Sequence, residues 1–304
     1  MVEAAQQHKR FALGIISRIK GSTPQKKGAK ALFFPDGTMT GTLGGGCLEA
    51  EVRRRAKQAL ATGKPETFEF TLDHNFGWDD GLICGGKVYG LILPAAAEAI
   101  SIWTELAKSD KTQTWAVDEN FHIQLLDVGR STLDVGRSPS LYEETVSPPH
   151  ALWIAGSGHV AQAVAPLAIN LDFEVTVFDD RPELANYDHF PKKTKLQLGN
   201  WGELLAVPFP TQSVFGLIAT RGHNHDADVL ADWIHKPFAF LGMLGSSRKI
   251  RLIRDGFLQK KIATSEQLAK VACPVGLPIQ AVGVNEIAVS IMAQLIEVRA
   301  RQLA

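Results

Sequence analysis

The chain has 304 residues, of which 45% are hydrophobic and 21% charged, a composition typical of a globular protein with room for two cores. Lysine plus arginine and aspartate plus glutamate both total 32, so the formal net charge of zero argues against nucleic acid or a membrane surface as partner. The sequence shows neither a bilayer-spanning apolar run nor a signal peptide. Three widely spaced cysteines fit neither a disulfide framework nor a zinc site, so we expect a reducing, cytoplasmic environment.

The first part of the chain alternates apolar segments with turn residues. Strands are predicted at 11–19, 29–34, 67–72 and 86–94. From Leu48 to Leu60, apolar side chains recur at helical spacing, and Gly63 and Pro65 end the predicted helix. Residues 1–95 are therefore predicted to form a small α+β domain.

A run of three glycines, Gly44, Gly45 and Gly46, lies directly before this helix and is followed by Cys47. Glycines allow the backbone to fold around a ligand, and the positive end of the helix favours the thiolate form of a cysteine. We therefore interpret Cys47 as functional. Cys84, which precedes Gly85 and Gly86, has two open interpretations, a buried filler or a second site cysteine.

Residues 96–150 contain a predicted helix and a predicted hairpin at 114–126, and we interpret this stretch as a connecting segment. From Ala151 onward strands and helices alternate, which predicts a parallel sheet. The fold class is therefore α/β, with a Rossmann-type domain at 151–304 after the smaller α+β domain.

The strand that ends at Ala155 leads into Gly156-Ser157-Gly158-His159-Val160-Ala161, a GxGxxA turn that opens a helix. The glycines permit a tight turn and close approach of a phosphate to the helix N-terminus. Asp179 and Asp180 end the next strand, where they either hold a ribose or cap a loop, and His159 either contacts a ligand or is solvated. Two later strand ends add candidate ligand-binding side chains: Arg221, His223, Ser246 and Arg248.

Several segments together resemble the XdhC/CoxI family, the xanthine dehydrogenase accessory factors. They are GSTPQKKGAKALFFPDGTMTGTLGGGCLEAEV, CGGKVYGLILP, LWIAGSGHVAQAVAPLA, VTVFDDRPELA, ATRGHNHDADVL, LGMLGSSRK and CPVGLPI. The chain departs from the family pattern at Gln25, where an arginine is usual.

The resemblance implies a chaperone rather than a turnover enzyme. Such a protein binds the molybdenum cofactor, supports replacement of an oxo ligand by a sulfido ligand, and passes the cofactor to a molybdenum hydroxylase apoenzyme. It also implies a cysteine desulfurase partner, a homodimer, and Cys47 as the residue linked to the cofactor and its molybdenum. The alternative from the Rossmann turn is an NAD(P)-dependent oxidoreductase, with His223 as its acid or base.

Overall fold

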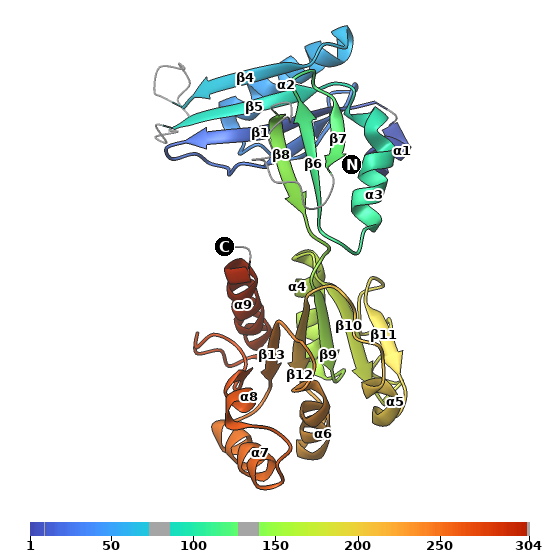
Figure 1. Ribbon diagram of the computed structural model, residues 1–304, viewed down its shortest axis with the longest axis vertical. Helices are drawn as coiled ribbons and strands as arrows, with labels where there is room; N and C mark the ends of the chain where they lie inside the picture. The colour runs from blue at the N-terminus through green and yellow to red at the C-terminus, as the bar shows by residue number, and fades with distance from the viewer. Residues whose placement is uncertain (9, 73–85, 127–139, 303–304) are drawn as a thin grey trace. The chain divides into compact units, whose positions relative to one another are not determined.

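The computed structural model describes residues 1–8, 10–72, 86–126 and 140–302. The chain divides into two compact units, Met1–Pro148 and Pro149–Ala304, each with its own sheet and core (Figure 1). The fold is mixed α/β, as predicted.

An antiparallel five-stranded sheet forms the centre of the N-terminal unit, in the order β3-β2-β1-β5-β4. Its strands are β1 (Ala12–Lys20), β2 (Lys30–Phe33), β3 (Met39–Gly41), β4 (Glu66–Thr71) and β5 (Lys87–Leu93). Strands β1, β2, β4 and β5 lie where the sequence predicts strands, and β3 adds a short edge strand.

Helix α2 (Gly46–Thr62) covers one face of this sheet. Its buried side chains come from one helical face and are those that the sequence periodicity predicts: Leu48, Val52, Ala56, Ala59 and Leu60. The helix ends at Gly63, whose φ of 69° is left-handed. Packing against β1 and β5 therefore fixes the direction in which the start of α2 points.

The other face of the sheet carries α1 (Val2–His8), a 3₁₀ turn η2 (Ala96–Ala99), α3 (Ile100–Lys108) and a second, three-stranded sheet. That sheet has the order β7-β6-β8, with strands β6 (Gln113–Asp118), β7 (Ile123–Leu126) and β8 (Ser140–Val146). The predicted hairpin is confirmed as β6 and β7. Trp115 packs between Trp103 and Tyr142, so this segment shares the core of the N-terminal unit.

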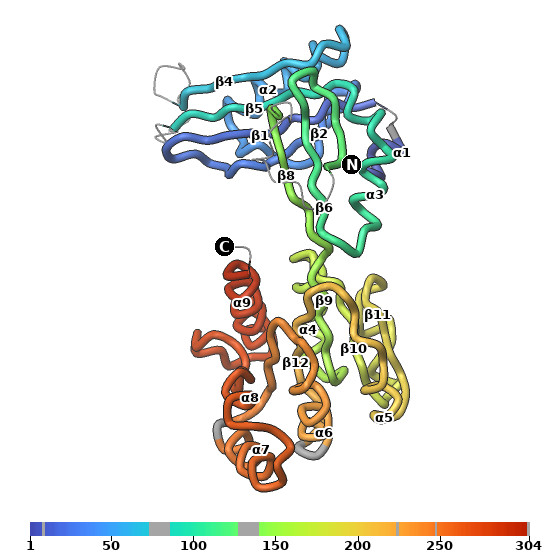
Figure 2. Tube along the Cα trace, viewed as in Figure 1, coloured from blue at the N-terminus to red at the C-terminus, as the bar shows by residue number. Residues whose placement is uncertain are grey.

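The C-terminal unit has a six-stranded parallel sheet in the order β11-β10-β9-β12-β13-β14. Figure 1 labels β9 to β13 of this sheet, and Figure 2 labels β9 to β12 on the Cα trace. Its strands are β9 (Ala151–Ala155), β10 (Glu174–Asp179), β11 (Lys195–Leu198), β12 (Val214–Ile218), β13 (Phe240–Met243) and β14 (Val271–Ala272). Numbered within the unit, this order is 3-2-1-4-5-6, that of the Rossmann fold. The order reverses direction between β9 and β12, where such sheets bind ligands.

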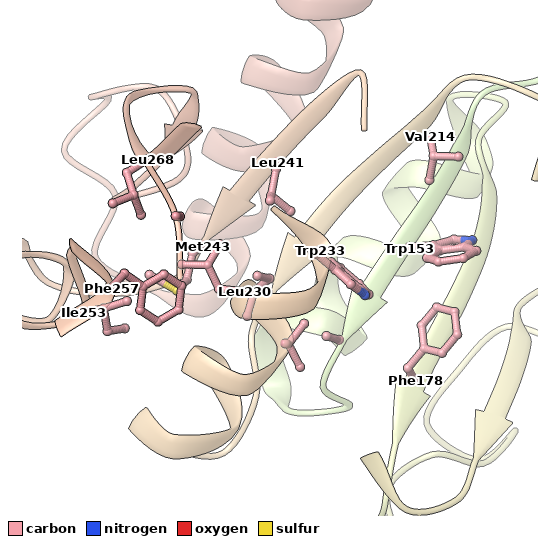
Figure 3. Close-up of a cluster of buried hydrophobic side chains, with 14 of the residues drawn as sticks. Trp153, Phe178, Val214, Leu230, Trp233, Leu241, Met243, Ile253, Phe257 and Leu268 are labelled. Carbon is pink, nitrogen blue, oxygen red and sulfur yellow. The ribbon is translucent and has the colours of Figure 1, made fainter. Parts of the chain in front are cut away.

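Helices cover both faces of the parallel sheet. On one face, α4 (His159–Asn170) and α9 (Val284–Gln302) enclose a hydrophobic core. The other face carries α5 (Trp201–Leu205), α6 (His223–Trp233), α7 (Ser247–Gln259) and α8 (Ser265–Ala269). Figure 3 shows the cluster on this second face, with Trp153 and Phe178 from the strands and Trp233 from α6.

Candidate functional site

The glycine run at the start of α2 has a positive φ at each of its residues. The φ angles are 110° for Gly44, 75° for Gly45 and 60° for Gly46. A Cβ on Gly45 would meet no atom within 4 Å, so the turn is open there. Among the hydrogen bonds of the described residues, none is donated by the backbone N–H of Gly46 or Cys47. These two amides, at the positive end of a 17-residue helix, are therefore available to an anion.

Cys47 is the second residue of α2 and is partly exposed. Its neighbour Glu49 fixes the approach to the glycines, because its carboxylate accepts hydrogen bonds from the backbone N–H of Leu43 at 3.0 Å and the hydroxyl of Thr42 at 2.8 Å. Burial opposes ionisation of Glu49, but these bonds, together with the backbone N–H of Gly45, outweigh it and lower its pKa. The carboxylate thus binds the backbone up to the middle of the glycine run and leaves the later amides open.

Three segments of the family-like sequence meet beside this turn. A Cβ on Gly44 would lie 3.0 Å from Cγ of Pro24 and 3.1 Å from Cγ of Gln25. A Cβ on Gly86 would lie 2.1 Å from the carbonyl oxygen of Ser22. The turn at 21–29 therefore packs against both glycine segments. A larger residue in place of Gly44 or Gly86 would push this turn away. Cys84 lies outside the described residues.

The Rossmann turn of the C-terminal unit has a different steric character. Gly156 has a φ of 111°, and a Cβ there would lie 2.2 Å from the carbonyl oxygen of Ala219. Its N–H donates to the carbonyl of Phe178 at 2.8 Å. Gly158 caps α4, where a Cβ would meet nothing within 4 Å, and the exposed His159 is the first residue of the helix. Gly156 thus closes the turn and Gly158 leaves its outer side open.

Asp179, at the end of β10, is only 1% exposed and its oxygens are used within the protein. One oxygen accepts from the N–H of Ser157 at 2.6 Å, and both accept from the guanidinium of Arg181 at 2.8 Å. Burial opposes its ionisation, but the hydrogen bonds from Arg181 and Ser157 outweigh it and lower the pKa of Asp179 to about 2. A ribose hydroxyl would have to compete with Arg181 for this carboxylate.

The next residue, Asp180, is less enclosed and connects two strand ends. Its carboxylate lies 2.8 Å from the guanidinium of Arg221, which follows β12. The side chains are 22% and 50% exposed. This ion pair joins the ends of β10 and β12, the two neighbours of β9, beside the GxGxxA turn.

A buried ion pair, Asp226 with Lys249, joins α6 to α7. Asp226 also accepts from the hydroxyl of Thr220 at 2.6 Å. Burial raises the pKa of the Cys273 thiol beside this pair. Three candidate residues lie nearby in the chain. His223 is the first residue of α6, and its side chain lies outside the described part. Ser246 is the N-cap of α7, and Arg248 in the first turn of that helix is exposed.

The structure thus brings Gly44 to Cys47 together in one unit, and Gly156, Gly158, Asp179, Asp180 and Arg221 together in the other. Sequence reasoning missed the roles of Glu49 and Arg181. Each had a local signal: a glutamate in the first turn of a helix caps the preceding loop, and an arginine two residues after a strand-end aspartate reaches back to it.

Two family models match this chain. The model described as XdhC and CoxI family matches residues 4–71, and that described as XdhC Rossmann domain matches residues 152–295. The chain belongs to the XdhC and CoxI family. In this XdhC-type chain the first match contains the glycine run and Cys47, and the second contains the whole Rossmann turn. The segment with η2, α3 and β6 to β8 lies outside both matches.

Curated relatives cover nearly the full XdhC-type chain. "Uncharacterized protein YqeB" of Escherichia coli is 29% identical over 97% of it, and the chain spans 44% of that longer protein. A protein of Bacillus subtilis described as a probable xanthine dehydrogenase subunit is 26% identical over 95% of this chain and 93% of its own. "Molybdenum cofactor insertion chaperone PaoD" of E. coli is 24% identical over 99% and 87%.

A crystal structure from Bacillus halodurans, described as a xanthine dehydrogenase, has the same fold. It aligns with a TM-score of 0.83 over 99% of this chain and 95% of its own, at 24% identity. Within the described ranges, none of the helices is long and apolar enough to cross a membrane. The same residues include no group of three or more His, Cys, Asp or Glu arranged to hold a metal ion.

Proposed function

We propose that this chain binds the molybdenum cofactor and supports its sulfuration and its insertion into a xanthine dehydrogenase-type molybdenum hydroxylase. Support comes from the family, and from the names of the B. subtilis and E. coli relatives. The observation that carries the proposal is the open glycine turn at the start of α2 with Cys47 inside it.

The cofactor fits this turn as cargo on two chemical grounds. Its phosphate matches the open amides of Gly46 and Cys47 at the helix N-terminus, and its soft molybdenum centre matches a thiolate ligand. When bound, the cofactor supplies the metal centre that the client enzyme needs. The protein's own part is to hold the anion with backbone donors, to present Cys47, and to keep the turn in shape through Glu49.

The Rossmann turn is better suited to bind a second anionic group than to bind a dinucleotide in the way that is usual for this fold. Gly158 and the start of α4 offer an open helix N-terminus, whereas Asp179 is engaged by Arg181 and Ser157. We therefore propose binding of the molybdenum cofactor, rather than of a dinucleotide, as the function of this chain. Binding of NAD(P) or another nucleotide stays a prediction, with Asp180 as the accessible carboxylate.

The proposal extends to the partners. It includes a client apoenzyme, a cysteine desulfurase as sulfur source, a homodimeric assembly and a cytoplasmic location. Cross-linking of the purified chain with a cysteine desulfurase tests that partner. Light scattering of the chain alone tests the homodimer.

The deciding experiment is anaerobic gel filtration with freshly released molybdenum cofactor. Wild type is expected to co-elute with molybdenum and pterin, whereas Cys47→Ala retains about tenfold less because it loses its metal ligand. Cys273→Ala is the matched control, since that thiol lies in the other unit, and should retain cofactor like wild type. Equal retention by Cys47→Ala removes Cys47 from the proposal. Failure of wild type to retain cofactor, with tight NAD(P)H binding, overturns the function.

A further inference from the structure

The turn at 21–29 is held from two sides, and only one of them belongs to the glycine segments. On that side, Pro24 and Gln25 pack against Gly44, three residues before Cys47. On the other side, the carbonyl oxygen of Gly28 accepts a hydrogen bond from the ammonium of Lys30 at 2.9 Å. Backbone bonds to β1 also hold this side, from the N–H of Gly28 to the carbonyl of Ile16 at 2.8 Å and from the N–H of Ile16 to the carbonyl of Ala29 at 2.9 Å. Lys30 adds a side-chain contact to them, so the position of the turn depends in part on what holds Lys30.

Lys30 is held by Glu144, 114 residues later in the chain. The ammonium lies 2.6 Å from one carboxylate oxygen of Glu144, and the two side chains are only 22% and 27% exposed. The ammonium also lies 5.9 Å from the ring centres of Trp115 and Tyr142. Partial enclosure and aromatic neighbours make this pair more specific than a solvated surface ion pair.

Glu144 is itself fixed by the second sheet. Its other carboxylate oxygen accepts a hydrogen bond from the indole N–H of Trp115 at 3.0 Å, and Trp115 is 1% exposed. A Cβ on Gly28 would lie 3.4 Å from the hydroxyl of Tyr142 and 3.9 Å from Glu144. Burial and the charge of Glu144 raise the pKa of Tyr142, so its ring stays neutral between Lys30 and Lys27.

We propose that Glu144 is a positioning residue for Cys47. It holds Lys30, Lys30 holds Gly28, and the turn that contains Gly28 presses Pro24 and Gln25 against the glycine run. Strand β8 and its partner β6, which lie outside both family matches, are thereby part of the cofactor site. The last step, from the position of Cys47 to cofactor binding, rests on the proposed function.

The test measures the alkylation rate of Cys47 by iodoacetamide in the full-length protein, quantified by peptide mass spectrometry. Glu144→Gln keeps an acceptor for Trp115 but loses the charge that holds Lys30, so the turn should loosen and expose Cys47, with a rise in rate of about threefold or more. Lys30→Gln should give a similar rise, and the double variant no more than either single one, because both act through one contact. Alkylation of Cys273 in the same samples should not change.

Glu69→Gln is the matched control, since Glu69 forms a solvated pair with Lys87 in the same unit, and it should leave the rate at Cys47 unchanged. If Glu144→Gln does not fold, Trp115→Phe removes the indole donor to Glu144, together with part of a buried ring, and tests the same chain of contacts. A wild-type rate at Cys47 in a folded Glu144 or Trp115 variant overturns the inference. A raised rate with no cofactor retained, even by wild type, upholds the positioning and overturns the proposed function instead.

Discussion

Helices α2 and α4 both begin after a glycine-rich turn, and the nearest carboxylate serves the two turns differently. Glu49 binds the N–H of Leu43, ahead of the glycines, and that of Gly45 within them, and the amides of Gly46 and Cys47 stay open. Asp179 binds the N–H of Ser157 inside the turn and is neutralised by Arg181. Glycines allow the backbone to approach an anion closely. The neighbouring carboxylate determines which backbone amides remain free to bind that anion.

The largest effect should come from breaking the Asp179–Arg181 pair. Arg181→Ala leaves a buried carboxylate without its cation, so the C-terminal unit should lose about 3 kcal/mol or more of unfolding free energy. Hydrogen exchange in increasing urea measures each unit separately. Arg55→Ala, which breaks the pairs with Glu51 and Glu66 at 3.3 and 3.8 Å, should cost the N-terminal unit less than about 1 kcal/mol. Equal costs would contradict the expected difference between a buried ion pair and a partly exposed one.

The second largest effect is a difference in stability between substitutions at glycines with and without space for a Cβ. Gly156→Ala places a Cβ against the carbonyl of Ala219 at a left-handed φ, so it should cost about 3 kcal/mol. Gly45→Ala is also strained by a positive φ, of 75°, but has free space, and should cost about 1 kcal/mol. Thermal and urea unfolding of both variants measure the difference. Gly158→Ala, with space and a φ of −70°, should be neutral within about 0.5 kcal/mol.

The pH dependence should report Asp179. Its pKa is about 2 in the folded chain and ordinarily 3.8, so its contribution is present above pH 4 and is lost as the pH falls through 2. The difference corresponds to about 2 kcal/mol of unfolding free energy in the C-terminal unit. Urea unfolding between pH 5 and pH 2 should show this loss in wild type. The Asp179→Asn/Arg181→Met double variant should lack it, and a loss of the same size there would assign it to other groups.

The smallest effect concerns the cap of the glycine run. Glu49→Ala removes the acceptor for Leu43 and Thr42, and should cost about 1 kcal/mol. Glu49→Gln keeps an acceptor and should cost less. Hydrogen exchange at Leu43 and at the first turn of α2 measures both. Unchanged exchange in Glu49→Ala would mean that packing of the turn at 21–29, rather than the cap, holds the glycines in place.

Local periodicity predicted most of the fold. The buried face of α2 and the parallel strands β9, β10 and β12 follow directly from side-chain spacing and from short apolar runs. The Rossmann turn was visible because strand, glycines and helix are adjacent in sequence. The strand β8 was not predicted, because its side chains are mixed in character and its pairing partner β6 lies more than 20 residues away.

The sequence predicted the backbone segments of the candidate site but not the side-chain contacts that hold them. The three glycines and Cys47 are contiguous, so their joint position needs no tertiary information. Arg181 lies two residues from Asp179, so their ion pair had a local signal. The pairing of Lys30 with Glu144 depends on side-chain orientation and on a contact over 114 residues. Sequence spacing does not contain that information.

The steric closure at Gly156 has an evolutionary consequence. Any residue with a Cβ at that position collides with the carbonyl of Ala219, so this glycine should persist even in lineages whose Rossmann unit no longer binds any ligand. Gly158 has empty space beside it and a φ of −70°, so small side chains are tolerated there once ligand selection ends. Retention of glycine at position 158, rather than at Gly156, is therefore the evidence that a lineage still binds a ligand.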